Sequence, residues 1–144
     1  MFARVQDVVL LAGRVAVAVV FMAHGLQKWN AGLDATSQMM ASTGMPLPTA
    51  AAIFAMTVEI LGSVAFIAGF LLPLVGLGYL VVALGALLSV HIDNGLTAQG
   101  GYELVLVLAF AGLALGFNGG RLSLDHLLFW RKRESRALAQ PQPA

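Results

Sequence analysis

The sequence predicts an all-α fold: a four-transmembrane-helix bundle of up-down-up-down topology, followed by a short interfacial helix. Of the 144 residues, 59% are hydrophobic and 10% are charged, whereas an ordinary soluble domain carries about 25% charged residues. The apolar residues come in long blocks rather than alternating with polar ones. Blocks of this kind fit the hydrocarbon core of a bilayer, so lipid is the expected solvent.

Four apolar segments are expected to cross the membrane: residues 8–29, 49–72, 74–91 and 102–117. A transmembrane helix needs about 20 residues to cross about 30 Å of hydrocarbon. The third and fourth segments are slightly short, which predicts little tilt or a locally thinned bilayer. The first segment is expected to be retained rather than cleaved as a signal peptide, because no small-residue cleavage site follows it.

The predicted membrane domain covers residues 1–130 and ends in an interfacial helix over residues 123–130, with Ser123 as its N-cap. The last residues, 131–144, are basic and have little apolar content. A segment of that composition cannot bury enough surface to fold. It is therefore expected to be a disordered tail.

The distribution of basic residues predicts that both termini are cytoplasmic, since positive charge accumulates on the cytoplasmic side of membrane proteins. Lys28 alone lies near the opposite ends of the segments. The basic residues on the side of the termini are Arg4, Arg121, Arg131, Lys132, Arg133 and Arg136. We expect a multi-pass protein of the cytoplasmic (inner) membrane.

Charge and cysteine content narrow the function classes. The formal net charge is +1, and no basic stripe follows a predicted surface helix, so nucleic acid is not an expected partner. The chain has no cysteine, which excludes disulfides and thiolate metal sites of its own. Any redox role must therefore use a bound cofactor or a partner protein.

Ionisable side chains inside apolar segments are the candidate site. His24, Glu59, His91 and Glu103 come from four different segments, and the expected topology puts all four in the outer half of the bundle. Each buried charge demands a partner or a cavity, because it costs roughly 2.5–3.5 kcal/mol to insert. Lys28 is expected to lie at the outer edge of the space between these four residues. The sequence thus predicts an outward-facing pocket for a ligand or for proton exchange.

Arg14 lies deeper in the first segment, near its cytoplasmic end. Its long side chain is expected to snorkel to the cytoplasmic headgroups, and the alternative is an upward reach to Glu59 as a buried counter-charge.

The other candidate residues have alternative interpretations as well. For His91, Glu103 and Lys28 an interfacial position in contact with water is an equal alternative. A minor alternative takes the two histidines and two glutamates as metal ligands, although no short ligand motif supports it.

The combined pattern resembles the DoxX family of small bacterial membrane proteins. The resemblance extends over residues 10–127 and rests on Gly13-Arg14, Phe21, His24-Gly25, Lys28, Gly44, Pro46, Pro48, Glu59, Gly62, Gly69, His91, Gly101-Tyr102-Glu103 and residues 119–125. It implies a four-helix membrane subunit. The relatives include quinone-linked membrane parts of thiosulfate oxidation and proteins tied to oxidative stress and thiol homeostasis.

Two functions from different classes follow. The first is an accessory of a membrane redox or oxidative-stress complex, whose outer pocket binds a quinone or another small ligand. The second is a non-catalytic anchor or assembly subunit, in which the polar cluster locks the helices together. Membrane lipid and other protein subunits are the expected partners in both cases.

A pair of glycines bears on how the helices pack. The pair Gly112 and Gly116 favours packing within the bundle, with a homo-oligomer as the alternative. Whether the chain is itself an enzyme is left open.

Overall fold

The structure is a computed structural model that describes residues 2–130, and the regular elements within that range are all helices. This confirms the predicted all-α class. The α-helices are α1 (Phe2–Ala31), α2 (Leu33–Ser42), α3 (Pro48–Thr57), α4 (Ser63–Ala68), α5 (Leu72–Ala86) and α6 (Glu103–Phe117). Shorter helical turns are η1 (Val58–Gly62), η2 (Leu87–His91), η3 (Ile92–Asn94) and η4 (His126–Trp130).

Three continuous helical segments are long and apolar enough to cross a membrane. They are Ala3–Ala31, Pro48–Ala68 and Leu72–Asn94. The fourth predicted span is an apolar helix as well, but Glu103–Phe117 has 15 residues. At 1.5 Å per residue it is about 22 Å long, which is shorter than the hydrocarbon core.

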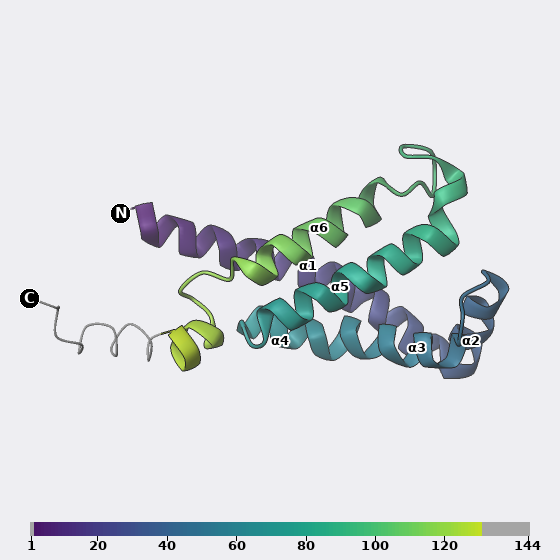
Figure 1. Ribbon diagram of the computed structural model, residues 1–144, viewed down its shortest axis with the longest axis horizontal. Coiled ribbons are helices and arrows are strands. Elements are labelled where there is room, and N and C mark those ends of the chain that lie inside the picture. Colours follow the sequence, from purple (N-terminus) through teal and green to yellow (C-terminus); the bar gives the residue numbers. More distant parts are fainter. Residues whose placement is uncertain (1, 131–144) are drawn as a thin grey trace, which may run out of the picture.

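The two ends of the molecule differ in what they contain (Figure 1). The start of α1 lies at the same end as residues 118–130, and we call this the N-terminal end. At the opposite end, the α2 end, lie α2 and the loop that leads into α6.

The helices pack around a small aromatic and glycine-rich core. The rings of Phe21 and Tyr79 stack with centroids 3.8 Å apart, and Phe66 meets Tyr79 edge-on at 5.0 Å. A Cβ atom added to Gly76 would lie 2.9 Å from the carbonyl oxygen of Gly112. The glycines thus let the backbones of α5 and α6 approach closely, so the predicted intrachain use of this glycine face is confirmed.

The turn between α4 and α5 corrects the predicted boundary at residue 72. The preceding helix ends at Ala68, with Gly69 in the left-handed region, and Leu72 already begins α5. The carboxylate of Asp125 accepts hydrogen bonds from the backbone N–H groups of Leu71 (2.8 Å) and Leu72 (2.7 Å). It supplies the N-terminal cap that no residue of the turn itself provides.

Helix α2 lies between the first two predicted spans, residues 8–29 and 49–72, where no helix is predicted from the sequence. Backbone in the left-handed region follows α2, where Gly44 has φ 76° and Leu47 has φ 50°. Before them, Leu33–Ser42 forms ten helical residues that bury Thr36 and Met40 against the bundle. Helix α2 thus covers the end of the bundle at which α1 ends and α3 begins.

The helix predicted over residues 123–130 is present. Residues 124–130 are helical, and the Ser123 hydroxyl accepts a hydrogen bond from the N–H of His126 (3.2 Å), as expected for an N-cap. The predicted disordered tail, residues 131–144, lies outside the described residues.

Candidate functional site

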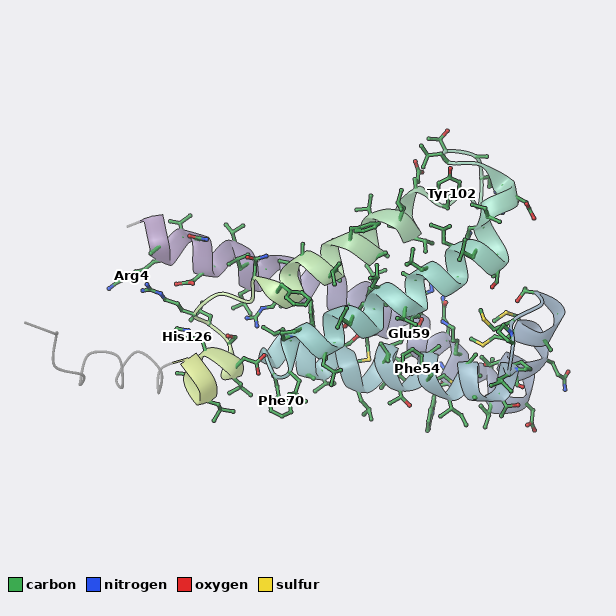
Figure 2. The ribbon with its side chains drawn as sticks, viewed as in Figure 1. Arg4, Phe54, Glu59, Phe70, Tyr102 and His126 are labelled. Atoms are coloured by element: carbon green, nitrogen blue, oxygen red, sulfur yellow. The ribbon has the colours of Figure 1, made fainter. Side chains whose placement is uncertain are left out.

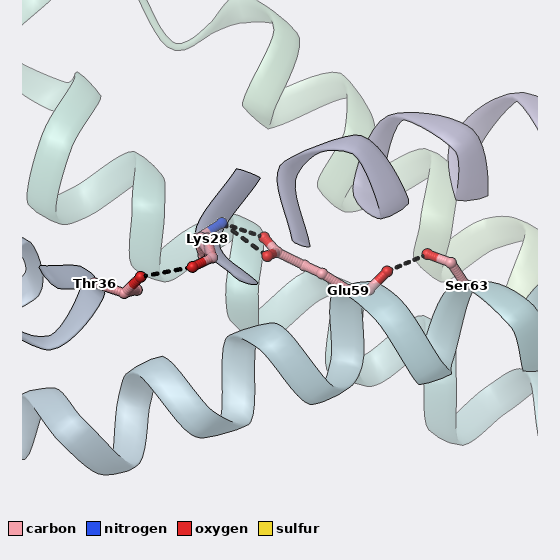
Figure 3. Close-up of polar contacts among 4 residues, drawn as sticks. All are labelled: Lys28, Thr36, Glu59 and Ser63. Atoms are coloured by element: carbon pink, nitrogen blue, oxygen red, sulfur yellow. Dashed lines mark hydrogen bonds and ion pairs between the residues drawn. The ribbon is translucent and has the colours of Figure 1, made fainter. Parts of the chain in front are cut away.

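A buried ion pair between α1 and η1 is the centre of the candidate site. The Lys28 ammonium donates to both carboxylate oxygens of Glu59, each at 2.7 Å (Figure 3). Glu59 is 3% exposed, whereas the Lys28 side chain is 21% exposed. A carboxylate enclosed to this degree needs a cation, and Lys28 supplies it.

The local backbone is shaped to receive this pair. A Cβ atom on Gly25 would lie 2.8 Å from the Cβ of Glu59, so only glycine allows α1 to approach this closely. Glu59 lies in the π-helical segment η1, and the Ser63 hydroxyl donates to the Glu59 carbonyl at 2.6 Å (Figure 3). Such π-helical turns often occur at functional sites.

An apolar cavity of about 220 Å³ adjoins the ion pair. Lys28 and Glu59 contribute the charged groups of its wall, and most of the rest is apolar. Its apolar lining comes from Met39, Met40, Met45, Ala51, Phe54, Ala55, Val81, Val82, Gly85, Ala86 and Val90. Phe54, Val81 and Val90 are exposed on the outside of the bundle, so the cavity reaches the face that lipid would contact between α3 and α5.

A second depression, of about 350 Å³, lies on the other side of Lys28, between α1 and α2. His24, Gln27 and Thr36 are among its lining residues, and Lys28 and Met39 belong to both spaces. His24 is exposed in this depression. His24 is therefore not the partner of Glu59, which pairs with Lys28 instead.

His91 and Glu103 do not join the buried pair. The Nδ1 atom of His91 lies 2.7 Å from the carbonyl oxygen of Gly100, so this imidazole is engaged by its own loop. Glu103 is exposed at the first turn of α6, where a helix dipole favours a carboxylate. The predicted convergence of four ionisable residues is thus reduced to one ion pair.

The structure gives no support to the metal alternative. Within residues 2–130 no three His, Cys, Asp or Glu side chains lie close enough to hold an ion. His91 is the last residue of η2 and Glu103 is the first residue of α6, and these two side chains form no ligand group with His24 and Glu59.

Arg14 is placed differently from either expectation. Its side chain is 0% exposed, so it does not snorkel, and its Nη2 donates to the carbonyl oxygen of Leu122 rather than to Glu59. The segment after α6 folds back over the guanidinium, and Gly69 leaves room for it by having no Cβ atom. The Nε and Nη1 atoms have no hydrogen-bond partner among the described residues.

Sequence reasoning also missed the contacts around Arg14. The Asp7 carboxylate accepts from the N–H of Arg121 at 2.9 Å, and the N–H of Asp125 donates to the carbonyl of Gly69 at 2.9 Å. These bonds tie α1, the α4–α5 turn and the segment after α6 together at the N-terminal end. The partners are mostly backbone groups, which carry no signal in a sequence.

Apolar helices of spanning length and a buried ion pair beside an apolar cavity define a helical integral membrane protein with a polar site inside the bundle. The chain belongs to the DoxX family, whose model matches residues 9–92 and thus includes Arg14, His24, Lys28 and Glu59. The resemblance recognised in the sequence is confirmed.

Two relatives are similar over most of their length. "Inner membrane protein YphA" of Escherichia coli (strain K12) is 31% identical over 131 residues, which cover 86% of this chain and 93% of the relative. "Putative oxidoreductase CatD" of Bacillus subtilis (strain 168) is 30% identical over 127 residues, which cover 88% and 91%. No solved structure matches the chain.

Proposed function

We propose that the chain is a four-span subunit of the cytoplasmic membrane that binds a small lipid-soluble ligand, such as a quinone, in the cavity beside Lys28 and Glu59. In this role it serves as an accessory of a membrane redox or oxidative-stress complex. The observation that carries the proposal is the apolar cavity of about 220 Å³ that ends on a buried ion pair.

The cavity has the size and lining of a ligand site. A cavity of about 150 Å³ lined by apolar side chains can bind benzene, so a space of about 220 Å³ accommodates a substituted six-membered ring. Its exposed wall between α3 and α5 would admit such a ligand, with an apolar tail, directly from the bilayer. Predominantly apolar lining with a few polar groups is the usual composition of small-molecule sites.

The ion pair gives the cavity its chemistry. A lysine ammonium has three N–H donors, and the two bonds to Glu59 leave one for a ligand carbonyl. Glu59 can accept or return a proton at that position, and His24 in the adjoining depression can exchange protons with water. A bound quinone would supply the electron-accepting group, and a partner protein would supply the electrons.

The membrane topology in this proposal has α6 as the fourth span and both termini in the cytoplasm. The excess of basic residues on the side of the termini supports the orientation. A locally thinned bilayer would accommodate the 15 residues of α6. The name of the relative CatD, which describes an oxidoreductase, supports the redox assignment.

Quinone titration of the detergent-solubilised protein tests the proposal. We expect a short-chain benzoquinone to bind, and Glu59→Gln to weaken binding by about tenfold or more, because the amide keeps the shape but loses the charge that orients Lys28. Glu103→Gln is the matched control, since Glu103 is exposed at the start of α6. It should bind as the wild type does.

The outcome also separates the two functional classes. If the chain is an anchor or assembly subunit, the ion pair only locks α1 to η1, and no quinone binds to any variant. Isolation of the native complex would then yield partner proteins whose association survives Glu59→Gln.

A further inference from the structure

Three methionines gather at the α2 end, around the wall that α2 adds to the cavity. Met39, Met40 and Met45 all line the same cavity of about 220 Å³. Figure 2 shows sulfur atoms gathered beside α2 at this end of the molecule. The chain has six methionines in all, so half of them lie in one short stretch and face one space.

The backbone explains how residues from one stretch meet. Met39 and Met40 are neighbours on α2, and α2 ends two residues later. The N–H of Met45 then donates to the carbonyl oxygen of Met40 at 3.1 Å, so the chain turns back over the last turn of the helix. The turn passes through Gly44 at φ 76°, a conformation that glycine adopts readily.

The three thioethers have graded access to the outside. Met39 is 44% exposed and also lines the depression that holds His24, whereas Met40 is 8% exposed. Met45 is half-buried, with its sulfur 4.0 Å from the Ser89 hydroxyl. The depression and the cavity share Met39, so we expect a small ion to reach the cavity from the depression by way of this residue.

We propose that Met39, Met40 and Met45 form a soft-metal site that takes Cu(I). Thioether sulfur is a soft ligand that selects Cu(I) over the harder divalent ions. The chain has no cysteine, so its soft ligands are methionine thioethers, and three of its six methionines line this cavity. The charged residues that line the same cavity, Lys28 and Glu59, form a pair of zero net charge, so they do not repel a monovalent cation as a lone lysine would.

The proposal goes beyond quinone binding and does not depend on it. Packing alone would be served equally well by leucine, because exchanges between methionine and leucine conserve volume and usually cost less than about 1.5 kcal/mol. Replacement by leucine therefore removes the sulfur atoms while keeping the cavity wall. That property makes the site testable without disturbing the fold.

Anaerobic titration with Cu(I) against a chromophoric Cu(I) chelator measures the site in the detergent-solubilised wild-type protein. We expect saturation at one ion per chain, and a loss of affinity of about tenfold or more in the triple variant Met39→Leu, Met40→Leu, Met45→Leu. The matched control is Met22→Leu with Met56→Leu, which removes two methionines outside the cavity lining. It should bind Cu(I) as the wild type does.

Two results would overturn the site: no Cu(I) binding by the wild type above a detergent blank, or equal binding by the wild type and the triple variant. If the triple variant does not fold, the double variant Met39→Leu, Met45→Leu leaves the buried Met40 in place and is expected to show the same loss. Quinone titration of the same proteins is read separately, so failure of the metal site is distinguishable from failure of the ligand cavity.

Discussion

Each end of the molecule buries one cation from α1, and the two cations are treated in opposite ways. At the α2 end Lys28 has a carboxylate partner and faces two open spaces. At the N-terminal end Arg14 is fully enclosed and donates to a backbone carbonyl. An accessible charge pair is suited to bind and exchange, whereas an enclosed guanidinium is suited to hold segments together. We therefore propose that the α2 end binds the ligand and that the N-terminal end holds the segments of the fold together.

The largest effect is expected from Gly69→Ala at the N-terminal end. Gly69 has φ 76°, and an added Cβ atom would come within 2.6 Å of the Ser123 Cα atom and would also strike the Arg14 guanidinium. Left-handed backbone costs a non-glycine residue about 1–2 kcal/mol, and the clash adds to that. We expect a loss of about 3 kcal/mol or more in unfolding free energy, measured by thermal denaturation in detergent.

Gly44→Ala is the control for that substitution. Gly44 also has φ 76°, but nothing lies within 4 Å of an added Cβ atom. Gly44→Ala should lower the unfolding free energy only by the cost of a left-handed backbone at a non-glycine residue, about 1–2 kcal/mol. Equal losses for both variants would mean that the close packing at Gly69 contributes nothing.

The next effect is expected from Glu59→Ala at the α2 end, which leaves Lys28 without its partner. Breaking a buried pair by removing one member typically costs about 3–5 kcal/mol, and the partial exposure of Lys28 moves this value to the low end. The double variant Lys28→Met, Glu59→Leu removes both charges and should regain most of the loss. A double-mutant cycle in thermal denaturation that gives no coupling would contradict the buried pair.

A smaller effect is expected from Arg14→Met, although Arg14 is the more buried cation. The substitution removes a charge that makes no ion pair within residues 2–130, and among these residues it leaves only the Leu122 carbonyl without its donor. One lost hydrogen bond costs about 0.5–1.5 kcal/mol, and relief of the buried charge offsets part of it. A loss as large as that of Glu59→Ala would show that Arg14 has a stronger partner than a carbonyl.

The smallest effect is expected from Glu103→Gln. The side chain is exposed at the start of α6 and belongs to neither cavity. Exposed substitutions usually stay within about 0.5 kcal/mol. A marked change in stability or in ligand binding would restore Glu103 to the candidate site from which the geometry removes it.

The membrane character of the chain and the need of Glu59 for a partner could be predicted from the sequence, because a carboxylate in an apolar segment demands a partner. Which residue becomes that partner depends on the direction in which each side chain points from its helix. Helical side chains point back toward the helix N-terminus, so the long side chain of Lys28 reaches along α1 toward Glu59, whereas His24 faces α2. The partner of Arg14 is a backbone carbonyl 108 positions away. No residue type marks such a contact, so sequence reasoning had no signal for it.

Photo-crosslinking with an azido-substituted quinone tests the central claim most directly, because it compares the two ends in one experiment. Labelled peptides should come from the cavity wall, near Phe54 on α3 and near residues 81–90 on α5 and η2. Unlabelled quinone in excess should suppress the labelling. Labelling concentrated instead in residues 116–126, most of which line a separate cavity of about 360 Å³ at the N-terminal end, would contradict the proposal that the ligand binds at the α2 end.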